Sequence, residues 1–237
     1  GEEYQPLLSP QKNYPEVTGV LVGEGEESFY ELCKYYDGKI ENLSEVKGIV
    51  YREAGEIVEK PFAFLKDLSS LKFAYEDFED FEHKIIYYES SRGCPFSCSY
   101  CLSSIDKSVR FRDLELVKGE LQTFIEAKVP QVKFVDRTFN CKASHAMEIW
   151  NYIYEHDNGV TNFHFEVAAD LITEEELALF AKMRKGLIQL EIGVQSTNEE
   201  TVCEIRRKMD FVKISERVTR VKNLGNIHQH LDLIAGL

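Results

Sequence analysis

The 237-residue sequence has no long apolar run and no recognisable export signal. A membrane-spanning helix needs about 18 consecutive apolar residues, and no segment approaches that length. The first residues also lack the succession of basic, apolar and small residues that marks a secretory signal. These absences predict a cytoplasmic protein without a membrane partner.

Basic charge is scarce relative to acidic charge, with 28 Lys plus Arg against 41 Asp plus Glu. A surface that follows a phosphate backbone is usually net positive, because it replaces the counterions of the nucleic acid. The composition therefore disfavours nucleic acid as a partner.

Six cysteines are too few, in too large a cytoplasmic chain, to indicate a disulfide framework. Cys33, Cys141 and Cys203 stand alone, and we expect each of them to be a small buried apolar residue. The other three cysteines lie within eight residues of one another. Their clustering indicates a function for their thiols.

From about residue 84 the sequence alternates between short apolar strands and amphipathic helices, which is typical of a parallel sheet or barrel. Two helix starts carry a capping-box pattern, Thr173 with Glu176 and Thr197 with Glu200. The five predicted strands are Lys84 to Glu89, Gln131 to Asp136, Asn162 to Val167, Leu187 to Val194 and Ile227 to Ile234.

Acidic residues lie at or near the C-terminal end of each predicted strand. In a βα barrel this end of the strands forms the active-site face, so a polar mouth is expected there. Some strands could instead lie at an edge and point these charges to solvent. The residues concerned are Glu89, Asp136, Glu166, Glu191 and Asp232.

Before residue 84 the pattern differs. Val17 to Val22 predicts a strand, Glu26 to Tyr36 a helix, and residues 46–51 and 56–59 a hairpin. We therefore divide the chain into a small N-terminal α/β part over residues 1–60, an acidic linker over 61–83 and a larger domain over 84–237.

The clustered cysteines are Cys94, Cys98 and Cys101, in a loop directly after the first strand of the larger domain. Gly93 and Pro95 favour a curled backbone on which three thiolates can converge. Soft thiolates suit an iron-sulfur cluster or zinc. Structural zinc needs a fourth ligand, for which Cys141, His83 or His145 are candidates, but no second Cys-x2-Cys pair is present.

The spacing Cys-x3-Cys-x2-Cys, with Tyr100 before the last cysteine, resembles the signature of the radical S-adenosylmethionine (SAM) superfamily. The resemblance implies a partial (β/α)6 TIM-like barrel of radical SAM type, of which about five βα units are present. It also implies that Cys94, Cys98 and Cys101 hold a [4Fe-4S] cluster with one iron open for SAM. Reductive cleavage of SAM then gives methionine and a 5'-deoxyadenosyl radical, which abstracts a substrate hydrogen.

The same resemblance suggests residues that contact SAM. Asp136 stands where the family has a Gly-Gly-Glu motif, without the glycines, and Glu191, Gln195 and Ser196 resemble the segment that approaches the ribose. The segment from Asp232 to Leu237, with Gly236, resembles the start of the adenine-side motif. The complete set of expected cofactor contacts is Tyr100, Asp136, Glu166, Glu191, Gln195, Ser196 and Gly236.

Residues 20–29 resemble the last strand, turn and helix of the cobalamin-binding, Rossmann-like domain that precedes many radical SAM enzymes. The cobalamin-ligating Asp-x-His-x-x-Gly segment of that domain does not occur in residues 1–83. We interpret the chain as a piece of a longer protein, truncated before its last barrel strand. Cobalamin is expected to bind only in the longer protein, and the activity of the piece by itself is in question.

The expected reaction is methylation, rearrangement or oxidation of an unidentified small molecule or peptide, by a methyltransferase or an oxidoreductase. The expected reductant is a flavodoxin or ferredoxin. Two alternatives stay open at this point: a non-catalytic iron-sulfur protein for electron transfer or regulation, and a structural zinc protein.

Overall fold

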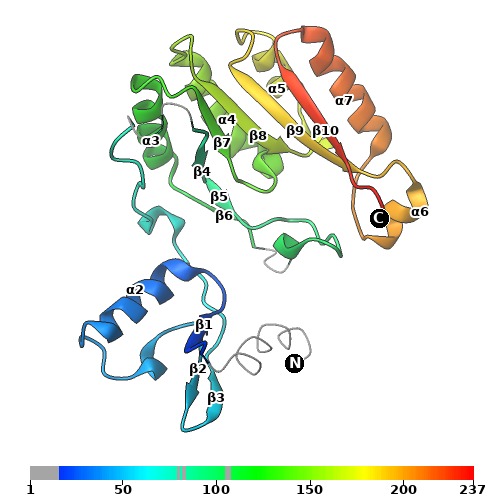
Figure 1. Cartoon of the computed structure of the whole chain (residues 1–237). Helices are drawn as coiled ribbons and strands as arrows, with labels where there is room; N and C mark the ends of the chain where they lie inside the picture. Colours follow the sequence, from blue (N-terminus) through cyan, green and yellow to red (C-terminus); the bar gives the residue numbers. More distant parts are fainter. Residues whose placement is uncertain (1–15, 79–80, 82–83, 105–107) are drawn as a thin grey trace. The chain divides into compact units, whose positions relative to one another are not determined.

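The computed structural model describes residues 16–78, 81, 84–104 and 108–237. The chain divides between Lys66 and Asp67 into two compact units, which Figure 1 colours along the sequence. Among the described residues, no helix combines the length and the apolar character needed to cross a bilayer.

Over residues 16–66, the described part of the first unit, the chain forms a three-stranded antiparallel sheet and one α-helix. Strand β1 (Gly19–Leu21) is followed by α2 (Gly25–Tyr36), and the hairpin of β2 (Ile49–Glu53) and β3 (Glu56–Glu59) completes the sheet in the order β1-β2-β3. Val46, Ile49 and Tyr51 form its small core. The predicted strand, helix and hairpin are confirmed, and the hairpin's first strand begins three residues later than expected.

The second unit is built on a five-stranded sheet in which every neighbouring pair is parallel. Its order, β4-β7-β8-β9-β10, follows the chain, so each helical connection returns the chain to a position beside the preceding strand (Figure 1). The predicted partial barrel of βα units is confirmed. The strands are β4 (Ile86–Tyr88), β7 (Gln131–Phe134), β8 (Asn162–Val167), β9 (Ile188–Gln195) and β10 (His228–Leu233).

Helices cover one face of this sheet and bury its apolar side chains. The covering helices are α3 (Leu114–Glu126), α4 (Ala143–Glu155), α5 (Glu174–Phe180) and α7 (Phe211–Leu224), while the short helix α6 (Glu199–Glu204) has no buried residue. Trp150 of α4 is fully buried, and its ring centroid lies 5.7 Å from that of Phe165 in β8 and 4.9 Å from that of Phe180 in α5. The opposite strand face carries polar side chains, because successive residues of a strand point to opposite sides.

Two helix starts test the capping predictions. Thr173 and Glu176 form the predicted capping box, with the Thr173 Oγ1 accepting from the Glu176 backbone N–H at 3.2 Å. The box predicted for Thr197 and Glu200 is wrong. Asn198 is the N-cap of α6, because its side-chain oxygen accepts from the Thr201 backbone N–H at 2.9 Å.

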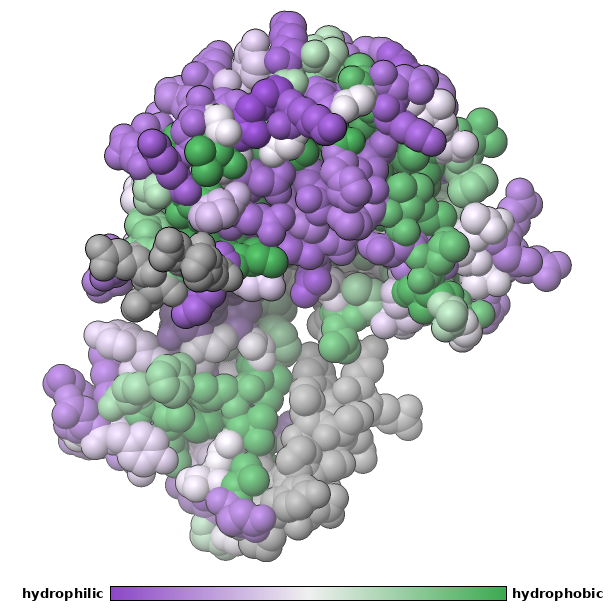
Figure 2. Space-filling view, turned by 45° about the horizontal axis from the view of Figure 1, so that its top comes forward, coloured by the Kyte–Doolittle hydropathy of each residue, from purple (hydrophilic) through white to green (hydrophobic). Residues whose placement is uncertain are grey.

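The surface of the second unit is predominantly polar in one view. Figure 2 shows hydrophilic residues over most of the visible face, with hydrophobic residues gathered at its right-hand side. The buried apolar core of this unit lies between the sheet and its helices. The polar face of the strands is not part of this core, and its side chains can line a site.

Candidate active site

The cysteine loop begins at the C-terminal end of β4 and is closed at its base by a short hairpin. Strand β5 (Ser91–Arg92) pairs antiparallel with β6 (Arg110–Phe111) in a separate two-stranded sheet, which holds the two ends of the loop side by side. Gly93 is required there, because its φ is +103° and an added Cβ would lie 2.2 Å from the Ser108 carbonyl oxygen. The loop that carries the three thiols is thus anchored by backbone pairing.

The three cysteines line one cavity of about 220 Å³ at the C-terminal ends of the strands. Cys98 is buried, with 6% of its surface exposed, while Cys94 and Cys101 are partly exposed. Of the predicted cofactor contacts, four line the same cavity: Tyr100, Glu166, Glu191 and Gln195. The sheet thus brings residues of β8 and β9 to the cysteine loop.

The donor set fits a polynuclear cluster better than a single ion. Among the described residues, no group of three His, Cys, Asp or Glu side chains is arranged around a single metal position. One zinc ion would need its sulfur ligands at about 2.3 Å, whereas a cluster binds each thiolate through a different iron. Three soft thiols on one cavity wall therefore suit an iron-sulfur cluster.

The zinc alternative also lacks a clear fourth ligand. His145 is 3% exposed and faces Ser90, whose Oγ lies 3.3 Å from its Nε2, and burial lowers its pKa to about 4. Cys141 is partly buried, and burial followed by the nearby Cys94 raises its pKa. His83 lies outside the described residues. Hence neither described candidate completes a four-ligand zinc site.

The lone cysteines only partly behave as expected. Cys33 and Cys203 are exposed, so the prediction that they are buried apolar residues is wrong. Cys33 lies on α2 and Cys203 on α6, where the position of a residue on the helix rather than its type decides its burial.

Asp136 follows β7 but does not line the cavity. It is fully buried and accepts hydrogen bonds from the Ser90 backbone N–H at 3.0 Å, from the Ser90 Oγ at 2.7 Å and from the Ser91 Oγ at 2.6 Å. Burial raises its pKa to about 6, and these hydrogen bonds oppose the rise. The geometry therefore gives Asp136 the task of fixing the start of the cysteine loop.

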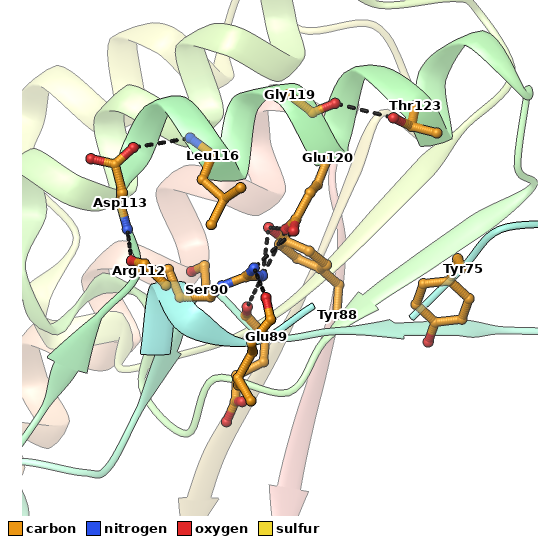
Figure 3. A network of polar contacts seen from close by, with 12 residues as sticks. Tyr75, Tyr88, Glu89, Ser90, Arg112, Asp113, Leu116, Gly119, Glu120 and Thr123 are labelled. Carbon is orange, nitrogen blue, oxygen red and sulfur yellow. Dashed lines mark hydrogen bonds and ion pairs between the residues drawn. The ribbon is translucent and has the colours of Figure 1, made fainter. Parts of the chain in front are cut away.

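A second buried network supports the loop from the helix side. Figure 3 shows the Arg112 guanidinium beside Tyr88 and the carboxylate of Glu120 on α3. The Arg112 Nη1 and Nη2 donate to the two Glu120 oxygens at 2.7 and 2.8 Å, and the Tyr88 hydroxyl donates to the same carboxylate at 2.6 Å. The Arg112 backbone N–H also donates to the Ser90 carbonyl at 2.9 Å. This network joins β4, the residue that follows β6 and α3.

On the polar strand face beside the cavity, a lysine and an imidazole lie next to one carboxylate, and burial lowers the pKa of the imidazole of His164. The Lys133 Nζ of β7 donates to Glu191 of β9 at 2.8 Å, and the His164 Nε2 of β8 lies 3.0 Å from the same carboxylate. Burial pushes the pKa of Glu191 upward, but Lys133 and then His164 outweigh it and hold the pKa below its ordinary value. Burial, and then Glu191, raises the pKa of Glu166. The cavity wall thus offers one carboxylate held in its charged form and one that is protonated more readily.

The end of β9 departs from regular strand geometry at the predicted ribose segment. Gln195 has a φ of +68°, a conformation that non-glycine residues rarely adopt. Its side chain folds back over Gly193, where an added Cβ would lie 2.2 Å from the Gln195 Nε2. Ser196 and Gly236 do not line the cavity, and the Ser196 Oγ instead accepts from the Asn198 backbone N–H at 3.2 Å. The strained turn therefore aims Gln195, but not Ser196, at the cavity.

Other lining residues were not singled out by the sequence. Arg137, Thr138 and Arg207 all face the cavity, and the Thr138 Oγ1 lies 3.6 Å from the Cys94 Sγ. No spacing or motif marks Arg207, which reaches the site from the loop after α6. Only the folded chain brings it there.

A family model described as the radical SAM superfamily matches residues 88–237, more than half of the chain. The hopanoid C-3 methylase of Methylococcus capsulatus is 26% identical over 226 residues, which cover 91% of this chain and 42% of that protein. The anaerobic magnesium-protoporphyrin IX monomethyl ester cyclase of Synechocystis is 23% identical over 202 residues, which cover 81% of this chain and 40% of that protein. The chain spans less than half the length of these relatives.

Solved structures show the same fold. The radical S-adenosylmethionine methyltransferase TsrM of Kitasatospora setae, solved with cobalamin and a [4Fe-4S] cluster, matches with a TM-score of 0.75 at 16% identity, covering 98% of this chain and 49% of that chain. The cobalamin-dependent S-adenosylmethionine radical enzyme OxsB matches with a TM-score of 0.77 at 21% identity, covering 97% of this chain and 35% of that chain.

Proposed function

Because the chain belongs to the radical SAM superfamily, we propose that Cys94, Cys98 and Cys101 hold a [4Fe-4S] cluster for the reductive cleavage of SAM. The observation that carries the proposal is the convergence of these three thiols on one cavity at the C-terminal ends of the parallel strands. Held by Cys94, Cys98 and Cys101, the cluster would supply the one electron needed to break the C5'–S bond of SAM, which would give methionine and a 5'-deoxyadenosyl radical able to take a hydrogen atom from the substrate.

The chain's own residues position these groups. Tyr100 and Gln195 lie on the cavity wall and offer a phenol and an amide for hydrogen bonds to SAM. Glu191 is charged and fixed by Lys133, which suits it to accept hydrogen bonds from ribose hydroxyls. Asp136 acts indirectly, by holding Ser90 and Ser91 ahead of Cys94.

The proposed reaction is methylation of an unidentified small molecule or peptide, with rearrangement or oxidation as the next candidates. Support comes from relatives that are named as a methylase, a cyclase and a methyltransferase. We propose that residues 1–60 are the C-terminal part of a cobalamin-binding-like domain, a proposal that rests on the TsrM match over almost the whole chain. Cobalamin would then bind in a longer protein.

The electron has to come from a low-potential donor in a reducing compartment. We propose a flavodoxin or ferredoxin as this donor and the cytoplasm as the location, because solvent-exposed thiols such as Cys33 and Cys203 stay reduced there.

The test is anaerobic reconstitution with iron and sulfide, followed by dithionite reduction, addition of SAM and chromatography for 5'-deoxyadenosine. We expect about four irons per chain, an electron paramagnetic resonance (EPR) signal that changes on adding SAM, and 5'-deoxyadenosine in the wild type. Cys98→Ala should lose cluster and product, while Cys203→Ala, which removes an exposed lone thiol, should keep both.

Each other result has a distinct meaning. A cluster whose EPR signal ignores SAM would support an electron-transfer or regulatory protein instead. A folded, colourless protein with stoichiometric zinc would contradict the proposal outright.

A further inference from the structure

The loop after α6 docks against the cysteine loop through its backbone. The Arg206 φ of +54° turns the chain at the end of this helix, and the Arg207 N–H donates to the Val202 carbonyl at 3.1 Å. The Ile205 carbonyl then accepts from the Ser99 backbone N–H at 2.9 Å. Since Ser99 directly follows Cys98, this hydrogen bond fixes the position of the loop after α6 next to Cys98.

The Arg207 guanidinium lies between the cysteine loop and the end of β9. Its Nη1 lies 3.9 Å from the Cys98 Sγ, and its Nη2 donates to the Gly193 carbonyl oxygen. Burial raises the pKa of Tyr100, and Arg207 opposes that rise through its charge and a hydrogen bond. Among the described residues, the Arg207 Nε–H is buried without a hydrogen-bond partner.

A cation placed in this way acts on the sulfur that it faces. Cys98 is the most buried of the three cysteines, so the interaction is less screened by water than it would be at Cys94 or Cys101. Hydrogen bonds and positive charge at the ligand sulfurs raise the reduction potential of an iron-sulfur cluster, because they stabilise its more negative, reduced state.

We propose that Arg207 is a positioning residue that sets the reduction potential of the cluster through the Cys98 thiolate. The inference rests on the proposed function, since it presupposes a cluster on these cysteines. It adds a residue that lies 109 positions from its thiol partner and belongs to no motif of the sequence.

The experiment is an anaerobic redox titration of the reconstituted chain, followed by EPR and by iron and sulfide analysis. One electron from dithionite reduces each oxidised cluster, and the midpoint is read from the reduced fraction. Arg207→Gln should lower the ratio of reduced to oxidised cluster about tenfold at a fixed potential, which for one electron corresponds to about 59 mV. Arg207→Lys, which keeps the charge, should stay near the wild type. Arg206→Gln removes an exposed charge from the same turn and should have a much smaller effect.

The outcomes separate the two proposals. Failure of the folded wild type to take up a cluster would overturn the proposed function, and this inference with it. A full cluster with an unchanged midpoint in Arg207→Gln would overturn only the role of Arg207. If Arg207→Gln folds but loads no cluster, Arg207→Lys decides: a wild-type midpoint supports the charge, and loss of the cluster or a lowered midpoint refutes it.

Discussion

Removing the Glu120 carboxylate should leave the positive charge of Arg112 buried and without its ion-pair partner in the second unit. The side chains of Arg112 and Glu120 are only 6% and 7% exposed, and their bidentate contact supplies the two shortest hydrogen bonds of the guanidinium. In Glu120→Leu the arginine keeps weaker contacts, to the Tyr88 hydroxyl at 3.2 Å and the Glu89 carbonyl at 3.3 Å. Breaking a buried pair in this way costs about 3–5 kcal/mol of unfolding free energy, a large share of the stability of a typical domain.

Urea unfolding followed by tryptophan fluorescence measures this loss. Trp150 is the single tryptophan and is fully buried in the same unit, so its emission reports on that unit. The double variant with Arg112→Met and Glu120→Leu should be less destabilised than Glu120→Leu, because no unpaired charge remains. Glu148→Ala breaks the exposed pair with Lys118 and should cost at most about 1 kcal/mol. A loss below about 1 kcal/mol in Glu120→Leu would refute the reasoning.

Three further predictions concern the loop, the helix caps and pH. Gly93→Ala should abolish iron uptake, because its Cβ would collide with the Ser108 carbonyl oxygen. Gly119→Ala places its Cβ in open space and should leave the iron content unchanged. Equal iron content in the two variants would contradict the requirement for glycine at position 93. Asn198→Ala should lower the unfolding free energy by about 1 kcal/mol in urea melts, and Thr197→Ala should lower it by much less. A larger loss in Thr197→Ala than in Asn198→Ala would contradict Asn198 as the N-cap. Burial raises the pKa of Glu176 from 4.5 to about 7, so its contribution to stability is full below pH 4.5 and declines as the pH rises to 7. Melts at pH 5 to 8 should show this decline in the wild type but not in Glu176→Gln, and parallel profiles would contradict it.

Much of the fold could be predicted because its signals are local. Each of the five strands falls within or next to its predicted range, since β-branched and aromatic runs between helical segments mark a parallel sheet. The capping box at Thr173 was visible for the same reason, because its partners are three residues apart. Before α6, two residues that can cap a helix, Thr197 and Asn198, are adjacent in the sequence. The helix begins at Glu199, and this makes Asn198 the N-cap.

The candidate site also has a part that the sequence predicts and a part that it does not. The three cysteines lie close together in one loop after Gly93, so their spacing in the sequence limits how far apart their thiols can be. The sequence by itself therefore determined the proposed ligand set and the family. The tertiary structure decided which distant side chains surround it. Asp136 matched a motif position but is buried under Ser90 and Ser91, while Arg207 matched none and reaches Cys98. The physical reason is that such contacts depend on the register of neighbouring strands and on the path of the loops between them, and no sequence spacing records either.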